Sequence, residues 1–175
     1  MKVSVERIQK VEKEGSRLLG VASVIINDYL YVYDVKIVQG QDKLFIAMPS
    51  KKVNETFKDV AHPTSNEAKE AIEKVVLSAF RGEEYKEQDL EELNVSDIHV
   101  KKIESALELL AVASVVFNKQ FVVKDILLVK RNGMYTILFP TRKATDGTFK
   151  PICLLKNKDL MYSIEKNIID AYTKM

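Results

Sequence analysis

Two pairs of basic residues occupy corresponding places in the two halves of this chain. The tetrapeptide Pro-Ser-Lys-Lys at positions 49–52 has a counterpart, Pro-Thr-Arg-Lys, at positions 140–143. Each pair follows a proline that ends a predicted strand, so we expect its side chains to project from a loop at a sheet end. Cations in such a place can neutralise nucleic-acid phosphates and give a salt-dependent affinity. The candidate contacts are Lys51, Lys52, Arg142 and Lys143.

Two further lysines extend this basic stripe. Lys58 and Lys150 each end a Thr-Phe-Lys tripeptide that lies a few residues beyond one of the basic pairs. The alternative interpretation is that all six cations are ordinary solvated turn residues. Recurrence in both halves does not decide between the two, because duplication also copies residues that have no role.

The chain lacks the residue patterns of an enzyme or a metal site. His62 follows Asp59 by three positions, but no Ser or Cys nucleophile motif and no metal-ligand spacing accompanies it. The six glycines do not cluster into a phosphate-binding loop. We therefore expect no catalysis, metal or cofactor. His62 is predicted to be structural and to hold the turn between a strand and a helix through a hydrogen bond, beside Pro63.

Two recurrent or alternating patterns leave their roles open. Asp34 and Asp125 recur at one register, and a lone carboxylate in each half is expected to anchor a neighbouring turn or a basic partner. Tyrosines at 29, 31 and 33 alternate along a strand and so share one face. Such a stripe could stack bases, but the second half lacks it, which favours a role in an interface between sheets.

The chain is a tandem duplication with a period of about ninety residues. Residues 20–35, GVASVIINDYLYVYDV, align without gaps on residues 111–126, AVASVVFNKQFVVKDI. The same register superimposes Pro49 on Pro140, and one inserted residue then brings the two Thr-Phe-Lys tripeptides together. The segment AIEKVVLSAF from position 71 also matches SIEKNIIDAY from position 163.

Each repeat predicts a series of antiparallel strands followed by one helix. In the first repeat, strands are expected at 3–11, 18–26, 29–38 and 44–48, and in the second at 95–103, 109–117, 121–129 and 135–139. Asn-Asp at 27–28 and Asn-Lys at 118–119 predict tight turns. Helices are predicted after the capping residues at 64–66 and from about Asn157. Each helix is expected to cover one sheet face, giving an α+β fold.

The charge distribution divides the chain into three parts. Residues 1–80 carry 12 Lys/Arg and 11 Asp/Glu, residues 81–94 carry 2 and 6, and residues 95–175 carry 13 and 8. We therefore expect a first unit at 1–80, an acidic connector at 81–94 and a more basic second unit at 95–175. The connector is expected to be a solvated spacer, with partial helicity left open. The basic balance of the second unit allows a polyanionic partner.

Composition and the lack of targeting segments predict a cytoplasmic protein. No apolar run approaches the roughly 20 residues needed to span a bilayer, so no membrane association is expected. The first residues do not resemble a signal peptide. The single cysteine, Cys153, cannot form an internal disulfide, is typical of a reducing compartment, and is predicted to be a small buried apolar residue.

The first repeat resembles the stage V sporulation protein G (SpoVG, septation protein) family. The segment MPSKK at 48–52, followed by FKDVAHP at 57–63, is similar to the family's Met-Pro-Ser-Lys-Arg and Phe-Arg-Asp-Ile-Ala-His-Pro. The resemblance covers residues 3–80. The second repeat keeps Pro140, the basic pair and Phe-Lys at 149–150, but has PICLL at 151–155 in place of Asp-Ile-Ala-His-Pro.

The resemblance implies both an architecture and a role. Family members usually have one unit and form homodimers, so the two repeats are expected to pack together as an intramolecular pseudo-dimer, with any further oligomerisation open. It also implies a regulatory protein of septation or sporulation that contacts DNA or RNA through the basic residues after Met-Pro-Ser. Lys52 replaces the family's usual arginine, which favours phosphate contacts over the reading of bases. The alternative is a protein-interaction module of the division or sporulation machinery.

Overall fold

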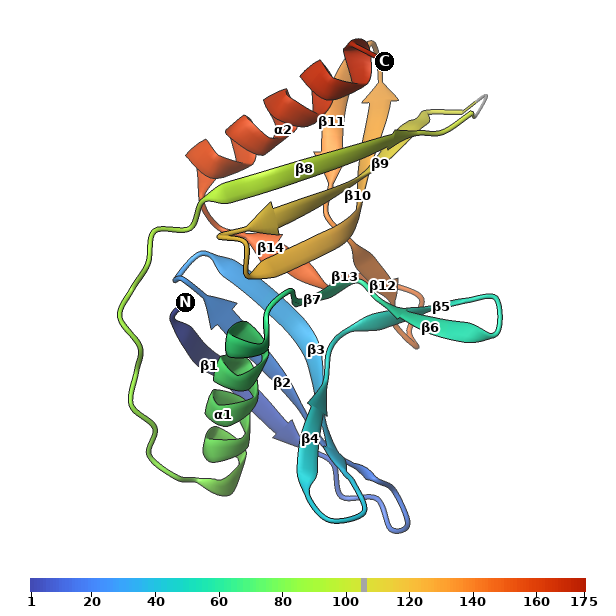
Figure 1. The fold of residues 1–175 in the computed structure, drawn as a ribbon. Coiled ribbons are helices and arrows are strands. Elements are labelled where there is room, and N and C mark those ends of the chain that lie inside the picture. The colour runs from blue at the N-terminus through green and yellow to red at the C-terminus, as the bar shows by residue number, and fades with distance from the viewer. Residues whose placement is uncertain (105–106) are drawn as a thin grey trace.

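Two five-stranded antiparallel sheets, each with its own helix, and two separate two-stranded hairpins form the protein (Figure 1). The structure is a computed structural model, and it describes residues 1–104 and 107–175. The elements of the first repeat are β1 (Val3–Lys10), β2 (Leu18–Ile26), β3 (Leu30–Gln39), β4 (Leu44–Ala47), β5 (Ser50–Val53), β6 (Thr56–Asp59), β7 (Ala61–Pro63) and α1 (Asn66–Arg81). Those of the second are β8 (Val95–Lys102), β9 (Leu109–Phe117), β10 (Phe121–Arg131), β11 (Met134–Leu138), β12 (Thr141–Lys143), β13 (Phe149–Pro151), β14 (Cys153–Leu155) and α2 (Lys158–Thr173).

The central hairpins of the two repeats form for the same local reasons. Strands β2 and β9 are rich in Val, Ile and Ala, and their residues alternate between buried and half-buried in an identical pattern. The predicted turns form, since Asn27 and Asn118, like the residues that follow them, have positive φ angles. Each Asn side chain also accepts a backbone hydrogen bond from the segment before the first strand of its repeat, at 2.8 Å for Asn27 and 2.7 Å for Asn118.

The two repeats exchange a short strand. β7 of the first repeat pairs with β10 of the second, and β14 of the second pairs with β3 of the first. Backbone hydrogen bonds continue the exchange beyond the paired residues. The Lys124 N–H donates to the Val60 carbonyl at 2.7 Å, and the Tyr33 N–H donates to the Ile152 carbonyl at 2.9 Å. The repeats are therefore joined by reciprocal backbone hydrogen bonds as well as by the connector.

One hydrophobic core runs through both repeats. Each helix begins at a capping side chain, with Ser65 accepting from the Ala68 N–H and Asn157 from the Leu160 N–H. α1 packs on β1, β2 and β4, and α2 packs on β8 and β11. The buried faces of both helices and both sheets belong to a single cluster of apolar side chains. The predicted α+β fold, with two repeats in one pseudo-dimeric body, is confirmed.

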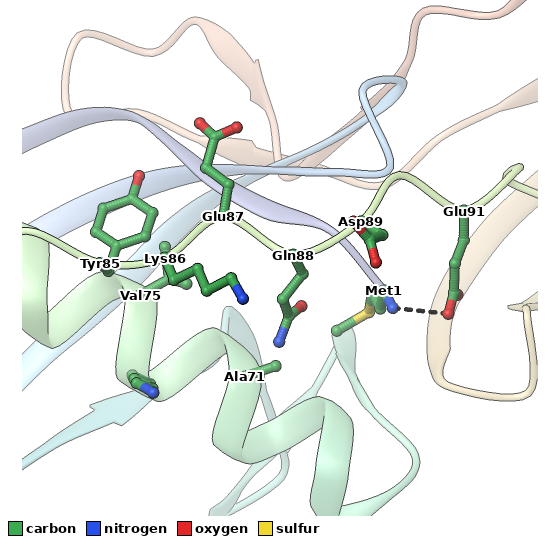
Figure 2. Close-up of a pocket in the computed structure, with 10 residues that line it drawn as sticks. Met1, Ala71, Val75, Tyr85, Lys86, Glu87, Gln88, Asp89 and Glu91 are labelled. Carbon is green, nitrogen blue, oxygen red and sulfur yellow. Dashed lines mark ion pairs between the residues drawn. The ribbon is translucent and has the colours of Figure 1, made fainter.

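Arg81, the first residue of the acidic connector, is the last residue of α1, and beyond it the connector follows an extended path without a helix (Figure 1). It is not only a solvated spacer, because Leu93 is 5% exposed and belongs to the core. Figure 2 shows the connector passing over α1, where the two segments line a cavity of about 490 Å³. Its lining mixes lysines with the carboxylates Glu87, Asp89 and Glu91, and the Met1 ammonium lies 3.0 Å from Glu91. Neither described helix is long and apolar enough to cross a membrane.

The exchanged strand β14 can be tested by a truncation beside it. Ile152 is buried at the point where its carbonyl accepts from β3, so Ile152→Ala should lower the free energy of unfolding by about 2–5 kcal/mol through the cavity that it leaves. Phe149→Ala, three residues earlier on the exposed strand β13, should change it by no more than about 0.5 kcal/mol. Urea unfolding followed by circular dichroism measures both. Equal effects of the two substitutions would contradict the exchange.

Candidate nucleic-acid interface

The candidate basic residues lie on two exposed β-hairpins rather than in loops. β5 pairs with β6 to form the first hairpin, and β12 pairs with β13 to form the second. Figure 1 shows both hairpins on the side of the molecule opposite the connector. The expectation of a basic loop at a sheet end is thus corrected: each segment turns back on itself and makes a small ladder of its own.

The prolines close the bases of these hairpins. Pro49 and Pro140 are buried, and their carbonyls accept from the N–H groups of Val60 at 2.9 Å and Ile152 at 2.8 Å. At the tip of the second hairpin, hydrogen bonds from the side chain and backbone of Thr148 lower the pKa of Asp146. This longer tip contains the residue that is inserted in the second repeat.

Like charges face each other across both hairpins. Lys51 is directly opposite Lys58, and Arg142 is directly opposite Lys150. Side chains directly opposite in an antiparallel pair lie on one face, and two cations in these positions repel each other. The repulsion between these opposed cations therefore lowers the stability of each hairpin.

A carboxylate from the other repeat partly offsets this repulsion on each hairpin. Lys51 Nζ lies 3.7 Å from Asp125 Oδ2, and Arg142 Nε donates a hydrogen bond to Asp34 Oδ2. The two ion pairs are equivalent under the alignment of the repeats. Of the two roles left open for the recurrent aspartates, binding to a basic partner is confirmed.

Backbone geometry explains why both of these positions carry aspartate. Val24 of β2 pairs with Val32 of β3, and Ala22 pairs with Val35. Between these two pairs, two residues of β3 lie opposite one residue of β2, which is a β-bulge, and β10 has the same bulge opposite β9. Asp34 and Asp125 lie in these bulges with φ angles of 59° and 56°. Aspartate tolerates this left-handed conformation better than most residues.

The remaining four candidate cations form no ion pair with a described residue of the other repeat. Lys52 Nζ lies 3.8 Å from Glu55 Oε2, an exposed pair of the kind that contributes little. Among the residues that the structure describes, no carboxylate forms an ion pair with Lys58, Lys143 or Lys150. The structure thus separates Lys51 and Arg142, which are held by the other repeat, from four cations that face solvent.

The second hairpin also borders a concave, basic surface of the first repeat's sheet. A cavity of about 390 Å³ is lined by side chains of β1, β2, β3 and the second hairpin, among them Arg7, Tyr33, Arg142 and Lys150. A neighbouring cavity of about 240 Å³ lies where Pro49 and Arg142 approach each other, so the bases of the two hairpins adjoin. The candidate residues of the two repeats are in this way brought to one region.

Two of the predicted structural residues, His62 and Pro63, lie in the exchanged strand β7. His62 Nδ1 is 2.9 Å from the Pro63 carbonyl, just before the start of α1. His62 pairs with Val122 and Pro63 with Phe121 in the ladder with β10. The role of His62 in holding the turn between β7 and α1 stays a prediction. Within the described residues, no group of three His, Cys, Asp or Glu side chains could hold a metal ion.

Two other sequence interpretations can be compared with the structure. Cys153 is buried in β14 as predicted, and burial raises the pKa of its thiol. Tyr31 is opposite Leu154 of β14, and Lys156 Nζ lies 3.7 Å from the centre of its ring. Because β3 and β14 belong to one sheet, these contacts do not test the predicted sheet-to-sheet interface, and that role of the tyrosine stripe stays a prediction.

Two exposed aromatic residues on the hairpins were not among the residues predicted from sequence. Phe57 is directly opposite Lys52, and Phe149 is directly opposite Lys143. Both side chains are more than two thirds exposed. The repeated Thr-Phe-Lys tripeptide marked their position, but a phenylalanine in a short strand is ordinarily expected to be buried.

Comparison with known proteins gives one consistent result. A model of the SpoVG family matches residues 1–82 and again residues 93–174. The chain is 37% identical to the septation protein SpoVG of Lachnospira eligens over 89 residues, which are 50% of this chain and 100% of that protein. It is 43% identical to the septation protein SpoVG of Phytoplasma australiense over 82 residues, which are 46% of this chain and 84% of that protein. It is 35% identical to the septation protein SpoVG of Finegoldia magna over 109 residues, which are 62% of this chain and 100% of that protein.

Two homologous α+β units that exchange strands within one chain make this protein a fused pseudo-dimer with a basic hairpin from each unit. The double match, together with relatives that cover about half of the chain, confirms the tandem duplication. The chain belongs to the SpoVG family.

The ion pairs between repeats can be tested by a double-mutant cycle. Asp34→Asn keeps a residue that tolerates the left-handed backbone but removes the charge, and Arg142→Gln removes the partner charge. We expect a coupling of about 0.2–1 kcal/mol in the free energy of unfolding, decreasing with added salt. The combination of Asp34→Asn with Lys166→Gln on α2 serves as the control and should be additive. Additivity in the first cycle would remove the ion pair as a stabilising contact.

Proposed function

We propose that this protein is a cytoplasmic regulator of the septation type that binds nucleic acid through its two basic hairpins. The observation that carries the proposal is the pair of like-charged contacts, Lys51 with Lys58 and Arg142 with Lys150, on hairpins that project from the body. Such pairs cost folding free energy, and a polyanion laid over them would offset that cost. The relatives that the chain matches are named septation proteins, which supports the regulatory context.

The chemistry of the cations favours contacts to the backbone of the nucleic acid. Lys52, Lys58, Lys143 and Lys150 carry compact charges on flexible stems, which suit phosphates and do not offer a bidentate fork to a base edge. The guanidinium of Arg142 has such a fork, but its Nε donates to Asp34, which ties this side chain to the other repeat. The proposal therefore assigns affinity to phosphate neutralisation, on DNA, RNA or both, without a catalytic step or a cofactor.

A second candidate function is a protein-interaction module of the division or sporulation machinery. The observation that favours it is electrostatic: Asp34 and Asp125 occupy two of the six candidate cations, and the connector carries an excess of acidic residues. In this case nucleic-acid affinity would be absent or incidental.

Charge removal on the hairpins separates these two functions. The quadruple variant Lys52→Gln, Lys58→Gln, Lys143→Gln and Lys150→Gln should bind DNA and RNA more weakly. Its plot of log K against log salt concentration should also flatten, by about 0.7–0.9 for each phosphate that the variant no longer neutralises. Fluorescence anisotropy with labelled single-stranded and duplex oligonucleotides at several salt concentrations measures both quantities.

A variant with a smaller charge change on another surface provides the control. Lys166→Gln with Lys174→Gln alters exposed lysines at α2 and its C-terminal end, and should leave the salt slope unchanged. If the hairpin variant and the unmodified protein bind equally, the hairpins are not the contact site. If the unmodified protein binds no nucleic acid at low salt, the interaction module becomes the supported function.

A further inference from the structure

Each basic hairpin displays one phenylalanine to solvent. Phe57 is 72% exposed and Phe149 is 71% exposed. The described hydrophobic core, with the side chains that pack against it, includes neither of them. A benzyl group in this position contributes almost nothing to folding by burial, since little of its apolar surface is removed from water. Burial within the folded chain therefore does not account for the phenylalanine on either hairpin.

A lysine accompanies each of these rings on the same face of its hairpin. Phe57 is directly opposite Lys52 and Phe149 is directly opposite Lys143, which places each aromatic side chain beside a lysine side chain on the same face. The following residue in each strand is also a lysine, directed to the other face. An apolar ring framed by cations differs from an ordinary hydrophobic docking surface, because the cations would oppose burial against another apolar protein face.

The backbone before each ring is held in place by a threonine. Thr56 Oγ1 donates to the Val53 carbonyl at 3.1 Å, and Thr148 donates from both its N–H and its Oγ1 to Asp146 Oδ1, at 2.9 Å and 2.6 Å. These bonds fix the hairpin tips on which the rings stand. A hairpin whose turn is already ordered loses less backbone freedom when a planar ligand binds beside that turn.

We propose that Phe57 and Phe149 stack on unpaired bases, so that the preferred ligand of the hairpins is single-stranded nucleic acid. This inference rests on the proposed nucleic-acid function and adds a preference for single-stranded over duplex nucleic acid. Aromatic side chains beside a cationic track are how single strands are held without sequence preference, because every base has a π face. In a duplex those faces are already occupied by neighbouring bases, so a duplex would gain only the phosphate contacts.

The first test compares substitutions that keep or remove the aromatic ring. Phe57→Leu with Phe149→Leu should weaken binding to a labelled single-stranded oligonucleotide by roughly five- to 150-fold for each base that loses its stacking partner. Affinity for the same sequence as a duplex should stay unchanged. Phe57→Tyr with Phe149→Tyr should bind single strands like the unmodified protein. Tyr162→Leu, which removes an equally exposed ring from α2, should have no effect on either ligand.

A second test detects the stacking directly. The chain contains no tryptophan, so Phe57→Trp introduces a single indole at the proposed contact. Its fluorescence should be quenched on addition of a single-stranded oligonucleotide. Inorganic polyphosphate, which offers the charges without bases, should leave the emission unchanged at concentrations that displace the oligonucleotide.

The outcomes separate this inference from the function on which it rests. If the leucine variant binds single strands as tightly as the unmodified protein while the lysine variant is weakened, phosphate contact stands and stacking is overturned. Equal losses for single strands and duplex also overturn it, since stacking predicts a selective loss. If the unmodified protein binds neither ligand, both proposals fall. Thermal unfolding midpoints of the phenylalanine variants should match that of the unmodified protein, because both rings are exposed.

Discussion

The reciprocal exchange of β7 and β14 is the constraint on which the rest of the arrangement depends. Each basic hairpin begins on an edge of its own sheet and ends in a strand that belongs to the other sheet. Backbone hydrogen bonds hold that last strand, from Lys124 N–H to the Val60 carbonyl in one direction and from Tyr33 N–H to the Ile152 carbonyl in the other. Each hairpin is consequently connected to a strand of its own sheet at one end and to a strand in the other repeat's sheet at the other end. The positions of the hairpins therefore depend on how the two repeats pack. If either exchanged strand were released, its hairpin would lose one of its two attachments.

The β-bulges at Asp34 and Asp125 couple the hairpins to the sheets a second time. Because the bulged residue has a positive φ angle, its side chain is directed away from the regular alternation of the strand. In each repeat this carboxylate reaches the first basic residue of the other repeat's hairpin. One local deviation in the backbone therefore serves two purposes: it bends the central strand, and it offsets part of the repulsion between the cations paired across the hairpin. The cations beyond this contact stay exposed, which leaves charge available for a polyanion.

The sequence predicted what is encoded locally and missed what depends on distant partners. Hairpin turns at Asn27 and Asn118 and the helix caps at Ser65 and Asn157 follow from side-chain chemistry within a few residues, and all four form. The strand exchange could not be predicted in this way, because β7 and β14 have three residues each and show no periodicity. The register shared by the aspartates and the basic pairs was visible, but their contact required the packing of one repeat on the other. The exposure of Phe57 could not be foreseen, since sequence alone does not show that β5 and β6 lack a covering layer.

Fusion of the two repeats allows the symmetric backbone to carry different side chains. A homodimer presents the same residue twice, whereas here the positions opposite Ser23 and Ser114 hold Arg7 in one sheet and His99 in the other. The next strand differs as well, with Tyr33 in the first repeat and Lys124 aligned with it in the second. His99 Nε2 lies 2.8 Å from Asp97 Oδ2, whereas Arg7 lines the cavity beside the second hairpin. The hydrogen bonds of the exchanged strands join backbone atoms, so they do not depend on the side chains that differ between the repeats. The exposed faces can therefore diverge without loss of the exchange, and the two hairpins stand beside unequal surfaces even though their own rings and lysines still match.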